Sequence, residues 1–397
     1  MIGISKLYCR TVEASDPLRY GRDSGKLPSH LLQFSADKRP VVVWNSTKAC
    51  NLRCAHCYSA SNCDPAPDEL TGEQARAMID DLACFGCPVL LISGGEPLMR
   101  PDLLEMIGHA RQAGMRAVVS TNGTLITPVK ADAFARAGLS YVGISLDGLR
   151  EVNDEFRGVA GAFDRAMEGI DNCQSAGVKV GLRLTLNRRN VEDIDGMFDL
   201  LEEKNIPRIC FYHLAYTGRG DQIRTDSLDA AQTREAIDRI IDRTVRLHRD
   251  RRQVEVLTVD NHADGPYLYL RLLEEDPARA ANALQLLQMN GGNSTGVGIG
   301  CVSWNGNVHP DQFWRNKVLG NVLHRPFSEI WTDPDNELLA KLRDRHKHLE
   351  CRCLDCRFLP MCNGNLRARA EAATGNLWGD DPACYLTDAE IEGDLPL

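Results

Sequence analysis

The stretch 48 KACNLRCAHCYS 59 places three cysteines, Cys50, Cys54 and Cys57, at the spacing C-x3-C-x2-C. It follows the short apolar run 41 VVVW 44, which is typical of a buried strand. Three thiolates can fill three corners of a four-iron, four-sulfur (4Fe-4S) cluster and leave the fourth iron open. The stretch therefore predicts an iron-sulfur centre with one open coordination position, on a loop at the end of a strand.

The same three cysteines permit a second interpretation, a zinc site with His56 as its fourth ligand. Tetrahedral zinc ligands usually come in spaced pairs, whereas His56 and Cys57 are adjacent, so we favour the cluster. A non-enzymatic cluster carrier or zinc-binding scaffold is a further alternative.

The composition excludes several classes of protein. The 397 residues are 43% hydrophobic and 25% charged, and no apolar run approaches the ~20 residues that span a bilayer. The net charge of -9 argues against a nucleic-acid partner, which needs a concentrated basic face. The segment 1 MIGISKLYCR 10 lacks the apolar core of a secretory signal, so we expect a cytoplasmic protein without a membrane anchor. In that reducing compartment, fifteen unevenly clustered cysteines favour metal or cluster ligation over disulfides.

Short β-branched and apolar runs alternate with amphipathic helical stretches over the first half of the chain. Six strands are expected, at 41–44, 88–93, 116–120, 141–146, 178–186 and 208–214. This alternation predicts an α/β fold, with a parallel sheet wrapped by crossover helices, either doubly wound or closed into a barrel.

The residues that carry chemistry follow these strands directly. The three cysteines come after the first strand, 94 GGEP 97 after the second, 122 NGT 124 after the third and 147 DG 148 after the fourth. Because the carboxyl ends of parallel strands meet at one edge, these segments are expected to form one binding site.

The remainder of the chain divides by composition. A charged segment contains one long predicted helix at 227–250, and the glycine-rich 291 GGNSTGVGIG 300 opens a last segment with an Asn-Gly hairpin signal in 301 CVSWNGNVHP 310. The expected units are an N-terminal extension, 1–40; an α/β domain, 41–220; a helical connector, 221–290; and a cysteine-rich domain, 291–397.

The last segment carries a second cysteine group. Cys353, Cys356 and Cys362 have the spacing C-x2-C-x5-C, and Cys384 follows after 21 further residues. Four thiolates close a cluster completely, although a four-thiolate zinc site has similar spacing.

The cysteine triplet with an aromatic ring at position 56, together with the GGEP turn, resembles the radical S-adenosylmethionine (radical SAM) enzymes. Over roughly residues 41 to 220 this resemblance implies a partial (β/α)6 barrel, a 4Fe-4S cluster whose open iron binds S-adenosylmethionine (SAM), and a 5'-deoxyadenosyl radical. It also implies contacts to SAM from His56, Gly94, Gly95, Glu96, Pro97, Asn122, Ser145, Asp147 and Arg183.

The second cysteine group resembles the C-terminal auxiliary-cluster domain called SPASM or its shorter twitch form. The resemblance implies at least one auxiliary 4Fe-4S cluster held by the four cysteines of this group. The full pattern is not present, because Leu366 stands where a further cysteine is expected and Cys301 is the single plausible upstream match. Whether Cys301 and the extra thiol Cys351 hold a second auxiliary cluster is left open.

Three segments, 1 MIGISKLYC 9, 28 PSHLLQFSADKRPVVVWN 45 and 212 YHLAYTGRGD 221, resemble radical SAM enzymes of the siroheme-dependent heme pathway and of heme d1 synthesis. The resemblance implies an iron tetrapyrrole substrate and a low-potential electron donor such as ferredoxin or flavodoxin. The expected reaction removes two acetate side chains from 12,18-didecarboxysiroheme and gives Fe-coproporphyrin III.

Two other reactions stay open. One is the removal of propionates in heme d1 synthesis, and the other is peptide maturation. A peptide substrate is disfavoured because 40 residues before the first strand are fewer than a leader-binding domain needs.

Candidate substrate residues are those that match carboxylates or iron. Arg219 is expected at the mouth of the site, where its guanidinium would bind a substrate carboxylate, and Arg19, Arg22 and Arg315 are weaker candidates. The candidate axial ligands of the substrate iron are His30, His213 and His262.

Overall fold

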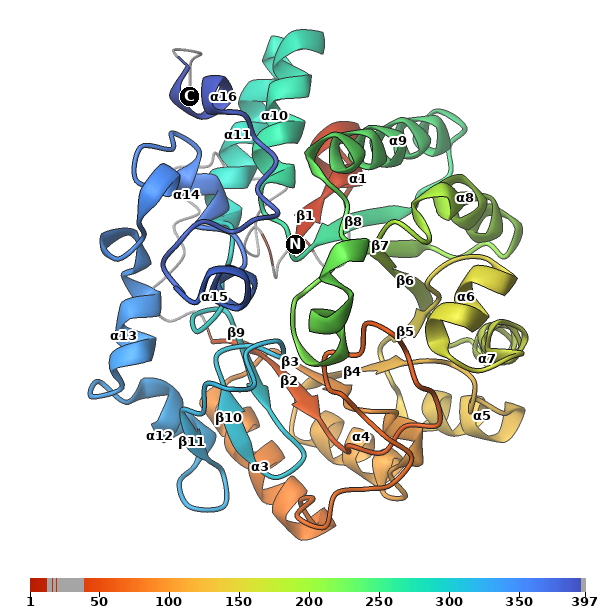
Figure 1. Ribbon diagram of the computed structural model, residues 1–397. Coiled ribbons are helices and arrows are strands. Elements are labelled where there is room, and N and C mark those ends of the chain that lie inside the picture. The colour runs from red at the N-terminus through yellow and green to blue at the C-terminus, as the bar shows by residue number, and fades with distance from the viewer. Residues whose placement is uncertain (13–15, 17–18, 20–38, 394–397) are drawn as a thin grey trace.

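The computed structural model describes residues 1–12, 16, 19 and 39–393. Its centre is one sheet, in which the described strands follow the order β1-β8-β7-β6-β5-β4-β3-β2-β9-β10-β11 (Figure 1). The strands are β1 (Ile2–Gly3), β2 (Val41–Asn45), β3 (Val89–Ser93), β4 (Arg116–Thr121), β5 (Val142–Ser145), β6 (Val180–Leu186), β7 (Arg208–His213), β8 (Glu255–Val259), β9 (Ile299–Val302), β10 (Asn307–His309) and β11 (Gly320–Asn321).

The six predicted strands are confirmed as β2 to β7, which pair in parallel with their neighbours in chain order. The sheet continues beyond them on both sides, because β8 pairs in parallel with β7 and β9 pairs in parallel with β2. The predicted hairpin is also confirmed, since β9 and β10 are antiparallel on either side of Asn305 and Gly306.

The segment 221–290, predicted as a helical connector, contains one strand besides its helices. It contains α9 (Ala230–Arg249), α10 (Asp264–Glu275) and α11 (Pro277–Asn290), but β8 lies between α9 and α10. The run 255 EVLTV 259 alternates as a strand should, yet it is short and lies between charged helices. It forms a strand because it pairs with the edge of β7. The first register pair is Arg208 with Glu255, which are 47 residues apart in the chain.

Helices cover the outer side of the curved sheet, and the C-terminal helices gather at one end of it (Figure 1). Several helix ends follow local rules: Thr71 and Gln74 form a capping box at the start of α3, and Gly138 ends α5 in the left-handed conformation. The remaining α-helices are α1 (Ile4–Cys9), α3 (Gly72–Phe85), α4 (Leu103–Gln112), α5 (Pro128–Ala137), α6 (Arg150–Arg157), α7 (Ala162–Ser175), α8 (Ile194–Glu203), α12 (Phe327–Thr332), α13 (Glu337–Arg343), α14 (Leu359–Cys362), α15 (Arg367–Thr374) and α16 (Asp388–Glu392).

The two faces of the parallel strands differ in polarity because side chains alternate along a strand. One set, which includes Trp44, Ile92 and Ile144, packs with the helices into the main hydrophobic core. The alternate set includes Ser145 and Arg183, which are register partners on β5 and β6 and line a cavity on the concave face. The main hydrophobic core thus lies between the sheet and the helices, and polar side chains of the concave face line the cavity.

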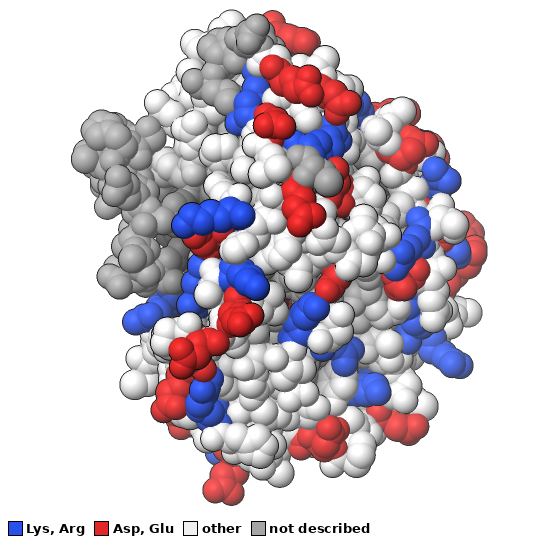
Figure 2. Space-filling model, turned by 60° about the vertical axis from the view of Figure 1, so that its left-hand side comes forward, with Lys and Arg blue, Asp and Glu red and all other residues white. Residues whose placement is uncertain are grey.

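The described part of the chain contains no helix with the length and apolar character needed to cross a bilayer. On the face shown in Figure 2, basic and acidic side chains are interspersed rather than separated into one basic patch.

Candidate functional site

The loop with the first three cysteines is held by backbone hydrogen bonds to segments far away in the chain. Arg53 and Ala55 donate their N–H groups to the carbonyls of Arg157 (3.1 Å) and Phe156 (2.8 Å), at the C-terminal end of α6. On the other side, the N–H of Arg219 donates to the carbonyl of Cys57 (3.0 Å). The chain's own backbone therefore anchors the loop on both flanks.

Polar donors reach two of the three sulfur atoms in this loop. Cys50 and Cys54 are buried and Cys57 is half-buried. Burial raises the pKa of Cys50 to about 12, and the nearby thiols Cys54 and Cys57 act in the same direction. The guanidinium of Arg157 donates to Sγ of Cys54 at 3.6 Å, and the N–H of Leu52 donates to Sγ of Cys50 at 3.4 Å. These donors offset the negative charge that ligation requires, so the residues present fit a cluster.

The second cysteine group is also brought together. The pKa of Cys362 lies well above its usual value because of burial and of its neighbours Cys384, Cys353 and Cys356. The α14 turn and the short helix η6 (Cys351–Cys353) provide the local scaffold. The side chain of Cys351 lies outside the described residues.

Neither group is arranged around a single ion. Among the described residues, no three His, Cys, Asp or Glu side chains converge on a position that one metal ion would fill.

Cys301 does not join the second group. It is fully buried in β9, where its Sγ accepts a hydrogen bond from Asn45 Nδ2 at 3.4 Å. The charged side chains that affect its pKa are Asp311 and Arg315, rather than the other cysteines. Whether Cys301 holds a second auxiliary cluster stays open.

The GGEP turn packs directly against the cysteine loop. The N–H groups of Gly95 and Glu96 donate to the carbonyls of Thr47 and Ala49, both at 2.7 Å. A Cβ on Gly95 would lie 2.1 Å from the Ala49 carbonyl oxygen, so only glycine allows this approach. The Glu96 side chain is fully buried and ties this turn to β4, because it accepts hydrogen bonds from Thr121 Oγ1 (2.7 Å) and the N–H of Asn122 (2.8 Å).

A buried polar cluster lies beside Cys54. His56 stacks on the ring of Phe156, and its Nε2 lies 3.4 Å from the Asp147 carboxylate. Burial lowers the pKa of His56 to about 4, so the ring is neutral at pH 7. Asp147 also pairs with Arg157, which in turn reaches the Cys54 thiol. Sequence reasoning missed Arg157, since nothing in 155 EFRG 158 marks it and its partners are remote in sequence.

A cavity of about 140 Å³ opens on the concave face next to this cluster. It brings together five of the predicted site residues, namely His56, Ser145, Asp147, Arg183 and His213. The Arg183 guanidinium donates to Ser120 Oγ at 2.6 Å and lies against Gly143, where a Cβ would come within 2.3 Å of its Nε. Tyr58 and Phe313 close the cavity from the cysteine loop and the C-terminal domain.

The predicted substrate residues differ in position and in hydrogen-bond partners. His213 lines the cavity and bonds through Nε2 to Asp264 (2.9 Å), whereas His262 uses Nε2 for the N-terminal amine of Met1 (3.3 Å). Arg219 donates from Nε to the carbonyl of Cys54 and from Nη1 to that of Ser61, both at 2.8 Å. Of the three guanidinium nitrogens, Nη2 alone has no hydrogen-bond partner among the described residues, so Nη2 is the atom that could bind a substrate carboxylate.

The weaker candidates are also engaged or lie outside the description. Arg19 pairs with Asp16 and Glu255, and Arg315 donates to the carbonyl of Ser59. His30 and Arg22 lie outside the described residues.

Replacing Arg219 with methionine is expected to loosen the cysteine loop. The substitution removes two charge-assisted hydrogen bonds from the cysteine loop. If the cluster-bound state loses ~1.4 kcal/mol of stabilisation, its equilibrium constant falls about tenfold. Release of iron to a chelator, followed by absorbance under anaerobic conditions, should become about tenfold faster. Arg224→Met is the control, because Arg224 lies in the same short helix and pairs with Asp221 instead. Equal release rates in both variants would contradict the bracing role.

Comparison with known proteins agrees with this geometry. Residues 44–201 match the radical SAM superfamily, and residues 298–357 match the SPASM iron-sulfur cluster-binding domain. The chain is 61% identical to Fe-coproporphyrin III synthase of Methanosarcina barkeri over 98% of this chain and 99% of that protein. It is 42% identical to pre-heme d1 synthase of Dinoroseobacter shibae, over 89% of this chain and 87% of that protein.

Among solved structures, Streptococcus suis SuiB bound to S-adenosylmethionine superimposes with a TM-score of 0.71 at 18% identity, covering 88% of this chain and 78% of that one. This likeness shows the fold. The two matched domains imply a 4Fe-4S cluster with SAM in the barrel and an auxiliary iron-sulfur cluster in the C-terminal domain. The chain is a radical SAM enzyme with a SPASM domain, and it belongs to the family of the Fe-coproporphyrin III and pre-heme d1 synthases that it matches.

Proposed function

We propose that this enzyme acts in heme biosynthesis and removes the two acetate side chains of 12,18-didecarboxysiroheme to give Fe-coproporphyrin III. The observation that carries the proposal is the 61% identity, over nearly the full length of both chains, to a protein named for that product. The reducing chemistry and the cysteine content favour action in the cytoplasm, with ferredoxin or flavodoxin as the low-potential electron donor.

We propose that Cys50, Cys54 and Cys57 hold the cluster that binds SAM, and that Cys353, Cys356, Cys362 and Cys384 hold the auxiliary cluster. When bound, the first cluster and SAM supply a 5'-deoxyadenosyl radical that takes a hydrogen atom from the substrate.

The chain's own residues set the surroundings of that chemistry. The GGEP turn and Asn122 border the cysteine loop and are the proposed contacts of the methionine group of SAM. Arg183, across the cavity, offers a guanidinium to a carboxylate. The rings of His56 and Phe156 stack on each other next to the cysteine loop.

The function is tested by anaerobic reconstitution followed by turnover. We expect about eight irons per chain, in two four-iron clusters. Incubation with SAM, a low-potential reductant and 12,18-didecarboxysiroheme should give 5'-deoxyadenosine together with Fe-coproporphyrin III, both identified by mass spectrometry. Formation of 5'-deoxyadenosine without any change in the tetrapyrrole would sink the substrate assignment.

The product also separates the alternatives. Loss of propionates instead of acetates would assign the chain to the reaction expected for heme d1 synthesis, to whose synthase it is 42% identical. Micromolar binding of a precursor peptide, with no spectral change on addition of siroheme derivatives, would favour peptide maturation.

A further inference from the structure

Asp260 has an unusual position at the end of β8, the strand that sequence patterns did not reveal. It directly follows Val259, the last residue of β8, and it lines the cavity. Its φ of 67° lies in the left-handed region, which costs a non-glycine residue about 1 kcal/mol or more. Such a conformation persists only where the surrounding structure enforces it.

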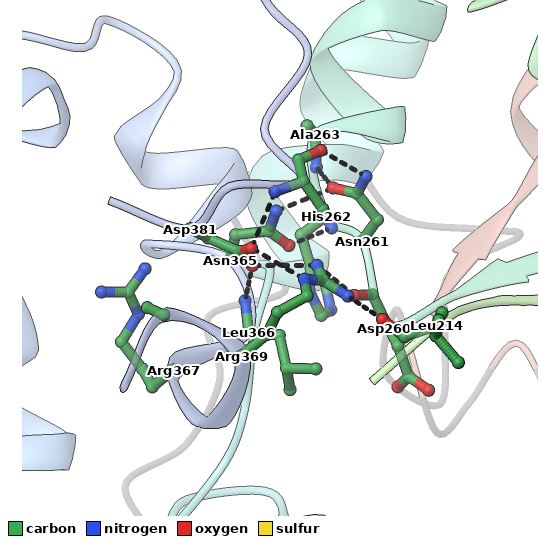
Figure 3. A network of polar contacts seen from close by, with 12 residues as sticks. Leu214, Asp260, Asn261, His262, Ala263, Asn365, Leu366, Arg367, Arg369 and Asp381 are labelled. Carbon is green, nitrogen blue, oxygen red and sulfur yellow. Dashed lines mark hydrogen bonds and ion pairs between the residues drawn. The ribbon is translucent and has the colours of Figure 1, made fainter. Parts of the chain in front are cut away.

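The C-terminal domain enforces this conformation through Arg369 on α15. The Arg369 guanidinium donates from Nη2 to the carbonyl of Asp260 at 2.9 Å and from Nη1 to the carbonyl of Leu214 at 3.2 Å. Asp381 holds the same guanidinium, with hydrogen bonds of 2.7 and 2.9 Å. Figure 3 shows this network joining the ends of β7 and β8 to the C-terminal domain. The main chain of Asp260 is thereby fixed independently of its side chain.

The side chain of Asp260 takes no part in that network. In Figure 3 its carboxyl group points away from Arg369 and Asp381. The residue is 9% exposed, and its buried Oδ2 has no hydrogen-bond partner within the described part of the chain. An unsatisfied buried polar group costs about 1–3 kcal/mol, more if it is charged. A carboxyl that bears this cost while it lines a cavity is poised for a ligand.

The order of the strands favours the substrate over SAM as the ligand of Asp260. The proposed SAM contacts lie on the cysteine loop, in the turns after β3, β4 and β5, and on β5 and β6, whereas β8 lies beyond β7 in the sheet. Asp260 therefore lies two strands farther along the sheet from β3 than Arg183 does, at a cavity-lining position where no SAM contact is proposed.

Resting on the proposed function, we propose that Asp260 is a substrate-binding residue whose free carboxyl oxygen forms a hydrogen bond with a carboxyl group of the tetrapyrrole. Carboxyl groups are the polar side-chain groups that such a substrate presents, and two carboxyl groups in a buried site can share one proton. The raised pKa of Asp260, about 7 as a result of burial, is compatible with this pairing.

Two variants separate this role from a structural one. Asp260→Gly removes the carboxyl and suits the positive φ, whereas Asp260→Asn keeps the shape and an N–H donor for a substrate carboxylate. Both remove an unsatisfied carboxyl, so neither should lower the thermal midpoint of the reconstituted protein. Asp250→Asn, at an exposed position after α9, is the matched control.

The readout is a spectral titration of the reconstituted protein with 12,18-didecarboxysiroheme, paired with a SAM-binding measurement. D260G is expected to raise the Kd for the tetrapyrrole about tenfold, as the loss of one charge-assisted hydrogen bond predicts, and D260N less than threefold. SAM affinity should be unchanged in both.

The outcomes are distinguishable. Wild-type affinity for the tetrapyrrole in D260G overturns the assignment alone, and weakened SAM binding in D260G reassigns Asp260 to the cofactor. A wild-type protein that cleaves SAM but does not bind the tetrapyrrole overturns the proposed function, and this assignment with it.

Discussion

Gly95→Ala is expected to reduce SAM cleavage about a hundredfold, since displacement of a catalytic group by about 1 Å can cost that much. The added Cβ would lie 2.1 Å from the carbonyl oxygen of Ala49 and 2.8 Å from that of Lys48. Both are backbone atoms next to Cys50, so no side-chain rotation relieves the clash. The cysteine loop must move, and the hydrogen bonds of Gly95 and Glu96 to Thr47 and Ala49 stretch or break.

Iron content and 5'-deoxyadenosine formation measure this effect. We expect iron to fall by up to about four per chain while the auxiliary cluster remains. Gly108→Ala is the control, because Gly108 lies within α4 and an added Cβ meets no atom within 4 Å. That change should stabilise the helix by roughly 0.5–1 kcal/mol and leave the chemistry intact. A G95A enzyme with full iron content and full SAM cleavage would refute the assigned contact.

Arg369→Met is expected to lower the free energy of unfolding by about 3–5 kcal/mol, the typical cost of removing one partner of a buried ion pair. Arg369 is 1% exposed and Asp381 is 3% exposed. Without the guanidinium, the Asp381 carboxylate keeps, among the described residues, the N–H groups of Leu366 and Ala383, both at 3.0 Å. The carbonyls of Leu214 and Asp260 lose a donor at the same time.

Urea unfolding of the anaerobic protein tests this prediction. Arg76→Met serves as the control, because the Arg76–Glu105 pair is exposed and should contribute at most about 1 kcal/mol. The double variant R369M/D381L should recover part of the loss, since replacing both members of a buried pair removes the unpaired charge. If R369M and R76M unfold at the same urea concentration, Arg369 does not join the domains as described.

The same contact links the auxiliary-cluster domain to the cavity. The N–H of Cys384 donates to the carbonyl of Asp381 at 3.0 Å, and Asp381 holds the Arg369 that fixes Asp260. The position of Asp260 in the cavity wall therefore depends on the folding of the C-terminal domain.

Features that depend on neighbours in the chain could be read from the amino-acid sequence. The spacing of Cys50, Cys54 and Cys57 is local, and so are the alternation that marks β2 to β7 and the Thr71–Gln74 capping box. The convergence of the cysteine loop and the GGEP turn was also predictable, because parallel strands bring their carboxyl ends to one edge.

Contacts between side chains that are far apart in sequence became visible in the folded chain. Arg157 reaches Cys54 over 103 residues, and Arg369 reaches Asp260 over 109. The tertiary structure also turns Arg219 toward the carbonyls of the cysteine loop. The physical reason is that hydrogen bonding and burial depend on positions in space, which local periodicity and spacing do not encode.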